Sequence, residues 1–255
     1  HDVRTEKLGS GAQRGEERLS LRGLTQEPHF RNIDLMAYAG EVLGVTGLLG
    51  DGRSELFSAV FGAEPMSAGE IRLCGQAVRI TSTRQAKRLG IAYVPRNRKE
   101  NGIIKDMSIL ENGTIVSWPD LMRRGLLNHE KQRAEFNEEK AALHIKMGGE
   151  NDSITSLSGG NQQKVVLAKW LSREPKVLIL DNPTQGVDVG AKEEIYDIIL
   201  KLAKEGVSVI VLSSEAQEII RVCDRALVMY HGEIVGEVSG ETMTEHEIMR
   251  LATGG

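Results

Sequence analysis

The sequence predicts an α/β fold with a mostly parallel core sheet, an antiparallel β portion and an inserted helical subdomain. Three observations support this prediction. Short apolar runs alternate with stretches of helical periodicity, which is typical of a parallel sheet with helices on both faces. A polar, helical block from about residue 104 to residue 160 interrupts this alternation. The last two apolar runs, Ala226–Tyr230 and Glu233–Val238, are separated at Gly232 and predict a closing hairpin.

Composition limits the function classes. The 255 residues suit one large or two small domains, and their net charge of −4 shows no basic stripe for a nucleic-acid partner. Cys74 and Cys223 form no metal or disulfide framework, which favours a reducing cytoplasm. No apolar run is long enough to span a bilayer, and no signal peptide is evident. His1–Glu17 is polar and without apolar period, so we expect a linker-like tail before a domain at 18–255.

The first elements follow in order along the chain. An apolar strand at Glu41–Thr46 runs into the glycine-rich segment Gly47–Ser54, and Glu55–Phe61 is expected to form a helix. Further strands are predicted and are broken by Gly75 and Gly90; they are Glu70–Leu73, Ala77–Ile80 and Gly90–Val94. The missing initiator Met and the linker-like start lead us to expect a piece of a longer protein.

The α/β pattern resumes after the helical block with the apolar strand Val177–Asp181. A helix is expected next, with Glu193 and Glu194 in its first turn and Gly206 at its end. Val207–Leu212 is a continuous apolar run, the pattern of a strand buried on both faces.

Gly47–Ser54 has the spacing of a P-loop between a strand and a helix. Gly47, Gly50 and Gly52 would let backbone N–H groups surround phosphates, and the hydroxyl of Ser54 would bind Mg²⁺. Asp181 ends a buried strand, where P-loop proteins hold the magnesium shell. Arg53 stands where lysine is expected, and its planar guanidinium reaches phosphate with a different geometry. The alternative is a glycine-rich turn that binds no ligand.

A second phosphate-binding pattern lies at Leu157–Lys164. Ser158 suits an N-cap, where its oxygen accepts from orphan backbone donors. Gly159 and Gly160 allow main-chain N–H groups to approach a bound group closely, and the positive end of the following helix favours an anion. Alone, this string could be an ordinary capped helix. Because the same sequence also contains the upstream P-loop and a strand that ends in Asp181, phosphate binding is favoured.

The segment from about Leu19 to Leu251 resembles the nucleotide-binding domain of ABC transporters. The string Leu157–Lys164 and the following Gly186–Lys192 are similar to the second, C-terminal ATPase domain of bacterial sugar importers of the ribose, xylose and galactose class. The resemblance implies a P-loop NTPase fold that binds ATP and Mg²⁺. It makes Gly47–Ser54 the Walker A loop, Asp181 the Walker B aspartate and Leu157–Lys164 the signature. It also implies that Pro183–Asp188 is the loop that crosses the dimer interface. The nucleotide-contacting set becomes Gly47, Gly50, Gly52, Arg53, Ser54, Asp181, Ser158, Gly159, Gly160 and Gln162, with Ser54 and Asp181 on the metal.

Several positions depart from the family pattern. Asn182 stands at the general-base position, and an amide cannot accept a proton from water. Ser214 occupies the position where the family has its switch histidine, and Arg96 replaces the glutamine that is usual after the strand Gly90–Val94. Together with Arg53, these changes predict a weak or non-hydrolysing Walker site and an isolated domain of little or no activity, while the intact signature serves the partner domain. No residue is assigned as catalytic. For adenine, His29 and Phe30 lie in the expected region, and the contact stays open.

The predicted function is an energy-coupling domain of a sugar importer on the cytoplasmic face of the bacterial inner membrane. Its expected partners are an N-terminal ATPase domain of the same chain, membrane permease subunits and, indirectly, a sugar-binding protein. The charged segment Arg96–Gly102 would dock on the permease, or is a solvated turn. The alternative function is a dimerisation and regulatory module that only donates the signature loop. Soluble ABC ATPases acting on ribosomes or DNA are disfavoured by the acidic charge.

Overall fold

The structure is a computed structural model that describes residues 14–255, so most of the predicted tail at His1–Glu17 lies outside the described residues. The described chain divides into two compact units. The core unit contains the residues up to Tyr93 together with Lys176–Asn182 and Ile199–Gly255. The helical unit contains Val94–Pro175 and Pro183–Ile198. Each unit is described by itself.

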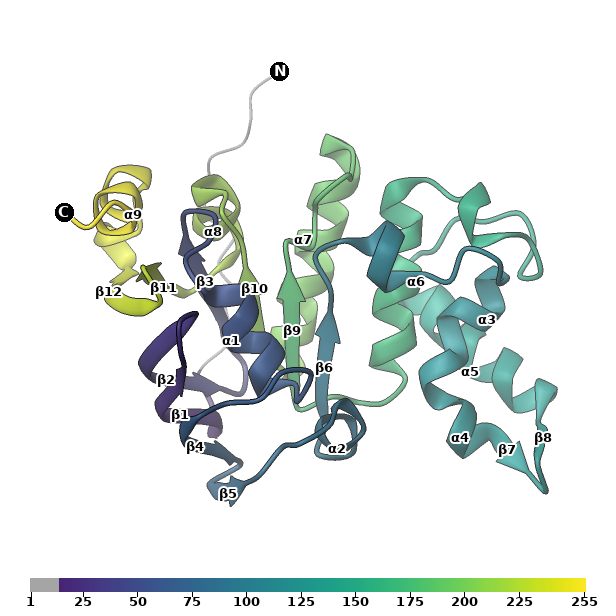
Figure 1. The fold of residues 1–255 in the computed structure, drawn as a ribbon. Coiled ribbons are helices and arrows are strands. Elements are labelled where there is room, and N and C mark those ends of the chain that lie inside the picture. The colour runs from purple at the N-terminus through teal and green to yellow at the C-terminus, as the bar shows by residue number, and fades with distance from the viewer. Residues whose placement is uncertain (1–13) are drawn as a thin grey trace. The chain divides into compact units, whose positions relative to one another are not determined.

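A six-stranded sheet forms the centre of the core unit (Figure 1). Its order is β12 (Glu233–Ser239), β11 (Arg225–Tyr230), β3 (Val42–Gly47), β10 (Ser208–Leu212), β9 (Val177–Asp181) and β6 (Ile91–Val94). β11, β3, β10 and β9 run parallel to one another, while β12 pairs with β11 antiparallel. Every residue of β3, β9 and β10 is buried, as expected for strands covered on both faces. The predicted mostly parallel core and closing hairpin are confirmed.

A second, antiparallel sheet completes the core unit. Its order is β2 (Phe30–Tyr38), β1 (Glu17–Gln26), β4 (Ala68–Leu73) and β5 (Gln76–Val78). The β1–β2 hairpin is absent from the sequence-based expectation. β1 begins at Glu17, inside the predicted tail, and register shifts along its pairing with β2 interrupt the alternation that would reveal a strand.

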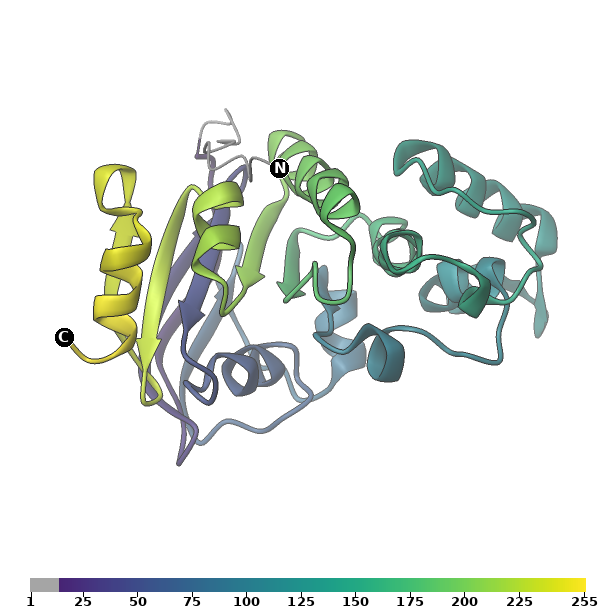
Figure 2. The same cartoon turned by 90° about the horizontal axis from the view of Figure 1, so that it is seen from above.

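Helices cover both faces of the core sheet. Figure 2 shows α1 (Arg53–Val60) on one side, and α8 (Ala216–Val222) and α9 (Glu245–Ala252) on the other. α1 buries Leu56, Phe57 and Val60, which fixes the helix that follows the phosphate loop. The short α2 (Thr83–Arg88) precedes β6 and is capped by Ser82, whose side chain accepts from the backbone N–H of Gln85.

The helical unit confirms the helical character predicted for the inserted block. Its elements are α3 (Ile109–Thr114), α4 (Trp118–Leu121), α5 (His129–Ala142), α6 (Gly159–Leu171) and the small hairpin β7 (Met122–Arg123) and β8 (Leu126–Leu127). Short 3-10 turns lie at Ile115–Ser117 and Ile154–Ser156, and a π-helical turn lies at Arg98–Gly102. Gly113 in α3 lies so close to the Phe136 ring that a β-carbon there would meet it at 2.6 Å.

α7 (Val189–Lys204) corrects one expectation. The sequence placed Glu193 and Glu194 in its first turn, but the helix begins at Val189 and has no acidic residue there. The backbone N–H of Lys192 already donates to the Asp188 carbonyl at 2.9 Å, so the helical bonding starts a turn earlier. The end at Gly206, with φ +96°, is confirmed.

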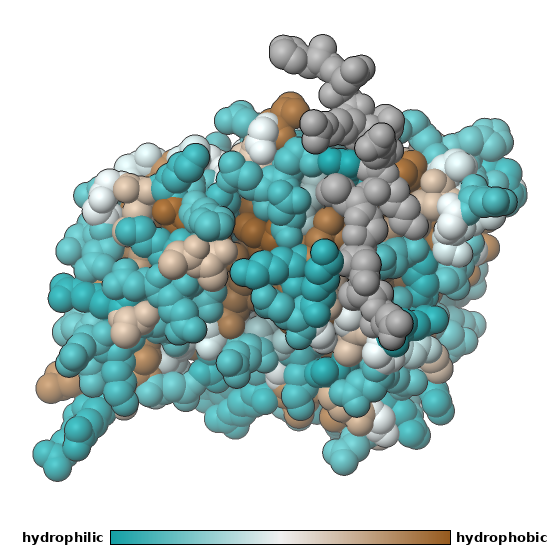
Figure 3. Space-filling model, turned by 180° about the vertical axis from the view of Figure 1, so that it is seen from behind, coloured by the Kyte–Doolittle hydropathy of each residue, from teal (hydrophilic) through white to brown (hydrophobic). Residues whose placement is uncertain are grey.

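Figure 3 shows one face of the molecule, on which the visible apolar side chains of the described residues are scattered among hydrophilic ones. Within residues 14–255, no helix combines the length and the apolarity that a membrane span requires.

Candidate functional site

The site in the core unit is built at the carboxyl ends of the parallel strands. The register places Val45 of β3 and Asp181 of β9 beside Leu212 of β10, so the loops that follow these three strands leave the sheet side by side. The backbone N–H of Asn182 donates to the Leu212 carbonyl at 2.7 Å, and that of Ser213 donates to the Val45 carbonyl at 3.2 Å. In open parallel sheets, ligands bind outside the carboxyl ends of the strands.

The glycine-rich segment forms the predicted loop between β3 and α1. Gly50 and Gly52 have φ values of +81° and +95°, which residues with a β-carbon rarely adopt. Gly52 is the N-cap of α1 and provides no side-chain cap, but the first amide of the helix, that of Arg53, donates to Oδ1 of Asp51 at 3.0 Å. Leu49 at the loop tip is 74% exposed. The loop therefore has the shape that phosphate binding requires.

The loop also contains a buried ion pair. The guanidinium of Arg53 lies 2.5 Å from the Asp51 carboxylate, and both side chains are almost completely buried. Nη1 of Arg53 further donates to the carbonyls of Gly47 at 3.2 Å and Leu48 at 3.3 Å. Nε of Arg53 is buried and has no hydrogen-bond partner among the described residues. A phosphate oxygen is a suitable acceptor for this donor.

Asp51 changes the charge of the loop. Burial raises the pKa of its carboxyl, and the adjacent Arg53 opposes this effect with its charge and hydrogen bonds. When Asp51 is ionised, its charge cancels that of Arg53. The loop then attracts phosphate through its backbone amides and the helix dipole alone.

The two predicted metal ligands lie together. Oγ of Ser54 donates to Oδ2 of Asp181 at 3.3 Å, and the hydroxyl of Tyr93 donates to the same oxygen at 3.1 Å. Two oxygen ligands of an octahedral Mg²⁺ at about 2.1 Å are separated by roughly 3 Å, so the hydroxyl and the carboxylate fit adjacent positions on this ion. The donor set is therefore suitable for magnesium when it accompanies a nucleotide.

Asn182 and Ser214 lie in the loops that follow the carboxyl ends of β9 and β10. Asn182 has φ +45°, a left-handed conformation that asparagine tolerates, and its Nδ2 donates to Oδ1 of Asp181 at 3.3 Å. Ser214 is exposed directly after β10. The structure thus brings Arg53, Asn182 and Ser214 into one unit, whereas Arg96 belongs to the helical unit. No ionisable base stands at the position of Asn182.

The residues considered for the adenine contact separate clearly. Phe30 is 1% exposed and belongs to the core. His29 is exposed in the turn before β2, and its carbonyl lies where a β-carbon on Gly52 or Gly232 would be. The turn at His29 therefore packs against the phosphate loop, and no aromatic contact to a base is assigned.

The signature turn forms the second candidate site, in the helical unit. Ser158 is the N-cap of α6, and its Oγ accepts from the backbone N–H of Asn161 at 3.3 Å and from Nδ2 of Asn161 at 3.0 Å. The predicted cap is confirmed. Ser158 is exposed, and Gly160 is buried. The side chain of Ser158 is therefore available at the surface of the unit.

The loop Pro183–Asp188 packs on this turn. A β-carbon on Gly159 would meet the carbonyl oxygen of Gly186, and one on Gly160 would meet Ala191 at 2.7 Å. Nε2 of Gln163 donates to the Pro183 carbonyl at 2.8 Å. Nε2 of Gln162 donates to the Leu157 carbonyl at 3.2 Å and thus closes the turn from inside. Gln162 is buried, so its role in this structure is to shape the turn.

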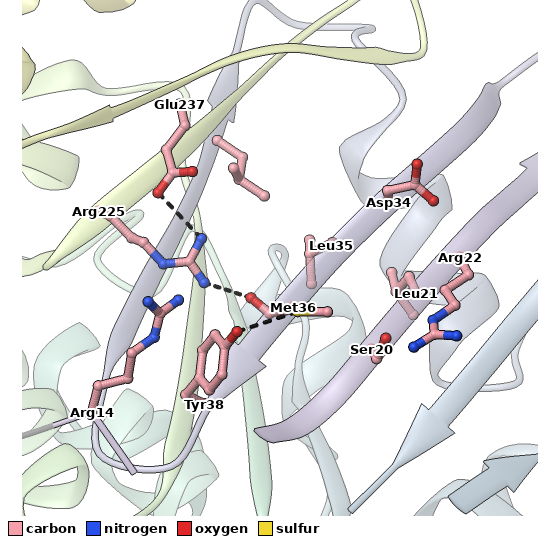
Figure 4. A pocket seen from close by; sticks show the side chains of 11 residues that line it. Arg14, Ser20, Leu21, Arg22, Asp34, Leu35, Met36, Tyr38, Arg225 and Glu237 are labelled. Carbon is pink, nitrogen blue, oxygen red and sulfur yellow. Dashed lines mark hydrogen bonds and ion pairs between the residues drawn. The ribbon is translucent and has the colours of Figure 1, made fainter. Parts of the chain in front are cut away.

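A separate hollow of about 590 Å³ lies in the core unit between β1, β2, β11 and β12 (Figure 4). None of its lining residues belongs to the phosphate loop. Two of its three arginines are engaged: Arg225 pairs with Glu41 at 2.8 Å, and Arg14 lies 3.6 Å over the Tyr38 ring. The third, Arg22, is exposed.

Sequence reasoning missed several residues of these sites. Asp51 occupies a variable position of the P-loop pattern, which carries no expectation about its side chain. Tyr93 and Gln163 lie within an apolar strand and a polar helix turn, and nothing in their spacing marks them. Arg98 is the exception, because it lies in the charged segment Arg96–Gly102 that the sequence analysis singled out.

Comparison with known proteins agrees with this geometry. Residues 30–185 match the ABC transporter family. The chain is 44% identical over 241 residues to the ribose import ATP-binding protein RbsA of Geobacillus kaustophilus, covering 94% of this chain and 49% of that protein. It is 42% identical over 240 residues to the galactose/methyl galactoside import ATP-binding protein MglA of Treponema pallidum, covering 93% and 48%. The chain thus spans about half the length of these relatives.

Solved structures share the fold. A nucleotide-free ATP-binding cassette from an ABC transporter superposes with a TM-score of 0.78 at 19% identity, covering 91% of this chain and 95% of that one. The dimeric bacterial ABC transporter cassette MJ0796 gives a TM-score of 0.73 at 22% identity, with coverages of 87% and 98%. These likenesses confirm the P-loop NTPase fold with its parallel core, antiparallel strands and helical subdomain.

Proposed function

Because the chain belongs to the ABC transporter family, we propose that it is the second, C-terminal ATP-binding domain of a tandem sugar-import ATPase. The similarity to ribose and galactose import proteins and the match to half of their length support a tandem sugar-import ATPase. The strings Leu157–Lys164 and Gly186–Lys192 support the second position. The first domain of the same chain is its dimer partner. Permease subunits and, through them, a sugar-binding protein complete the system at the cytoplasmic face of the bacterial inner membrane.

The proposal depends on one observation, the contrast between the signature turn at Ser158 and the phosphate loop. The turn at Ser158 is capped, exposed and built around closely packed glycines. The phosphate loop instead contains the Asp51–Arg53 ion pair. At the end of β9, Asn182 stands in place of a base. We assign ATP hydrolysis to the partner domain's Walker site, which Ser158, Gly159 and Gly160 complete across the interface.

The chain's own Walker site holds nucleotide weakly. The amides of the loop and the first turn of α1 would bind the phosphates, and Ser54 and Asp181 would hold Mg²⁺. When bound, that ion neutralises charge on the phosphates. Loss of a general base typically lowers the rate of a hydrolytic step by about 10²–10⁴. Asn182 orients water without accepting its proton, so this site releases phosphate slowly or not at all.

One observation favours a second candidate, a module that only donates the signature turn. The ionised Asp51 cancels the charge of Arg53 inside the loop. If the remaining dipoles do not hold phosphate, the chain binds no nucleotide, and its contribution is dimerisation and the signature.

Calorimetry of ATP and Mg²⁺ binding to this chain, with phosphate release followed in the same sample, separates the two candidates. Binding without turnover supports the weak-site proposal. No binding supports the donating module. Brisk turnover contradicts both.

The assignment of the signature is tested in the full tandem protein. S158A should lower turnover far more than R53A, because the former removes a contact to the hydrolysing site and the latter alters the inactive one. The proposal fails if R53A abolishes turnover while S158A leaves it unchanged.

A further inference from the structure

The charged segment Arg96–Gly102 contains a buried arginine. Arg98 is 5% exposed, whereas the next residue, Lys99, is exposed. Burial lowers the pKa of Arg98, and within residues 14–255 no acidic group counteracts this effect. A buried guanidinium without a carboxylate partner is costly unless its hydrogen bonds are made. The position of Arg98 therefore requires an explanation beyond surface charge.

Arg98 makes its hydrogen bonds to two different functional segments. Nε donates at 3.2 Å to Oε1 of Gln162, a residue in the first turn of α6. Nη1 donates to the carbonyl of Gln185 at 3.2 Å, and Nη2 donates to that of Gly186 at 3.4 Å. A β-carbon on Gly159 would lie 3.0 Å from the same Nη2. The planar guanidinium thus lies between the signature turn and the loop Pro183–Asp188.

The segment is also fixed at its other end. Residues 98–102 form a π-helical turn, closed by a hydrogen bond of 3.0 Å from the Ile103 N–H to the Arg98 carbonyl. Nζ of Lys169, two turns further along α6, donates to the Gly102 carbonyl at 2.8 Å. Both ends of the turn are therefore bound to α6. Wide turns of this kind often occur at functional sites.

We infer that Arg98 is a positioning residue that makes the Arg96–Gly102 segment, the signature turn and the Gln185–Gly186 backbone move as one body. Because its three donors are set in one plane, a displacement of the segment carries both loops with it. This inference rests on the proposed function in one respect, namely that the signature turn serves the partner domain's ATP site. A segment that docks on a permease would thereby report directly to that site.

The test uses R98Q, R98K and the control K131Q in the full tandem protein. K131Q removes a positive charge from an exposed position of α5, outside the Arg96–Gly102 segment. R98K keeps the charge but loses the planar arrangement of donors. Hydrogen exchange of backbone amides is followed at Gly102–Ile103, at residues 158–161 and at residues 185–188, and steady-state ATP hydrolysis is measured in parallel.

For R98Q, exchange at all three places should accelerate together, while β9 amides keep wild-type protection. The kcat should fall by about 2- to 30-fold, the range for residues that couple separate elements. The KM for ATP should change less than kcat, because nucleotide first binds at the partner's own Walker loop. R98K should lie between R98Q and wild type, and K131Q should match wild type.

The inference is overturned if R98Q and K131Q give the same exchange and the same kcat. It is also overturned if only one of the two loops loosens, because Arg98 then does not join them. If R98Q does not fold, R98K and Q162M provide the same comparison, since each breaks the contact from one side. S158A in the same protein separates the two failures. If S158A is silent, the proposed function has failed; if S158A is harmful and R98Q is silent, only the role of Arg98 has failed.

Discussion

The carboxylate of Asp51 and the guanidinium of Arg53 lie 2.5 Å apart inside the phosphate loop, and both are shielded from solvent. A P-loop ordinarily presents one uncompensated positive charge to its phosphates. In this chain that charge is cancelled from within the loop. The affinity of the chain's own Walker site is therefore determined by Asp51 as much as by the replacement of lysine by Arg53.

D51N should strengthen binding of MgATP by roughly tenfold, about 1.4 kcal/mol, because the loop gains a net positive charge. The raised pKa of Asp51 indicates that burial costs the carboxylate more than Arg53 returns. Removing its charge leaves the buried guanidinium of Arg53 without its counter-ion, so the free energy of unfolding should fall by about 3–5 kcal/mol. Calorimetry and thermal unfolding measure both quantities. D106N, the same change at an exposed position, should alter neither, and equal affinities for wild type and D51N would contradict the argument.

The same carboxyl predicts a pH dependence. Because the pKa of Asp51 is raised above its usual 3.8, the folded state binds this proton more tightly than the unfolded state. The stability cost of the charged form is thus present at neutral pH and is relieved as the pH falls through the raised pKa toward 3.8. Protonation also frees the charge of Arg53. Nucleotide binding by wild type should strengthen on acidification relative to D51N.

The comparison with D51N makes the pH experiment interpretable. Protonation of ATP itself affects both proteins equally and cancels in the ratio of their dissociation constants. We expect this ratio to approach one at low pH and to widen toward neutral pH. A ratio that does not vary with pH would show that Asp51 does not control the charge of the loop.

The sheet illustrates how far sequence predicts this fold. β9 has the predicted bounds, Val177–Asp181, because a continuous apolar run ending in a charge has one natural register. β1 was missed because its bulged pairing with β2 gives no regular alternation. The start of α7 was misplaced by a turn, because acidic residues normally mark a first turn and here they lie in the second.

For the sites, sequence predicted loops but not the contacts between them. The spacing of Gly47–Ser54 and the string at Ser158 are local patterns, and the structure has the predicted turn and cap at both. Asp51 becomes informative only when its side chain is seen on Arg53. Arg98 likewise bonds to Gln162, 64 residues further along the chain, and no local pattern encodes such a distant contact.

G159A should destabilise the helical unit by about 1–3 kcal/mol, the usual cost of overpacking. The added methyl group would meet the backbone carbonyl of Gly186, which cannot rotate away as a side chain can. Chemical denaturation of the chain measures the loss. G190A is the matched control, because a β-carbon there meets nothing within 4 Å and alanine is favoured in a helix. Equal stabilities for G159A and G190A would show that the turn and the loop do not pack closely.

Asn182 provides the last test, because it distinguishes a water-orienting amide from a residue without a chemical role. If this site does not hydrolyse ATP, N182A should leave turnover by the tandem protein within about twofold of wild type. N182A should nevertheless cost about 1–2 kcal/mol of stability, since alanine disfavours the left-handed φ of +45° at this position. N182G removes the same side chain without that backbone cost and should match wild type in both measurements. A fall in turnover of 10²-fold or more for both variants would mean that this Walker site hydrolyses ATP, with the amide of Asn182 holding the attacking water.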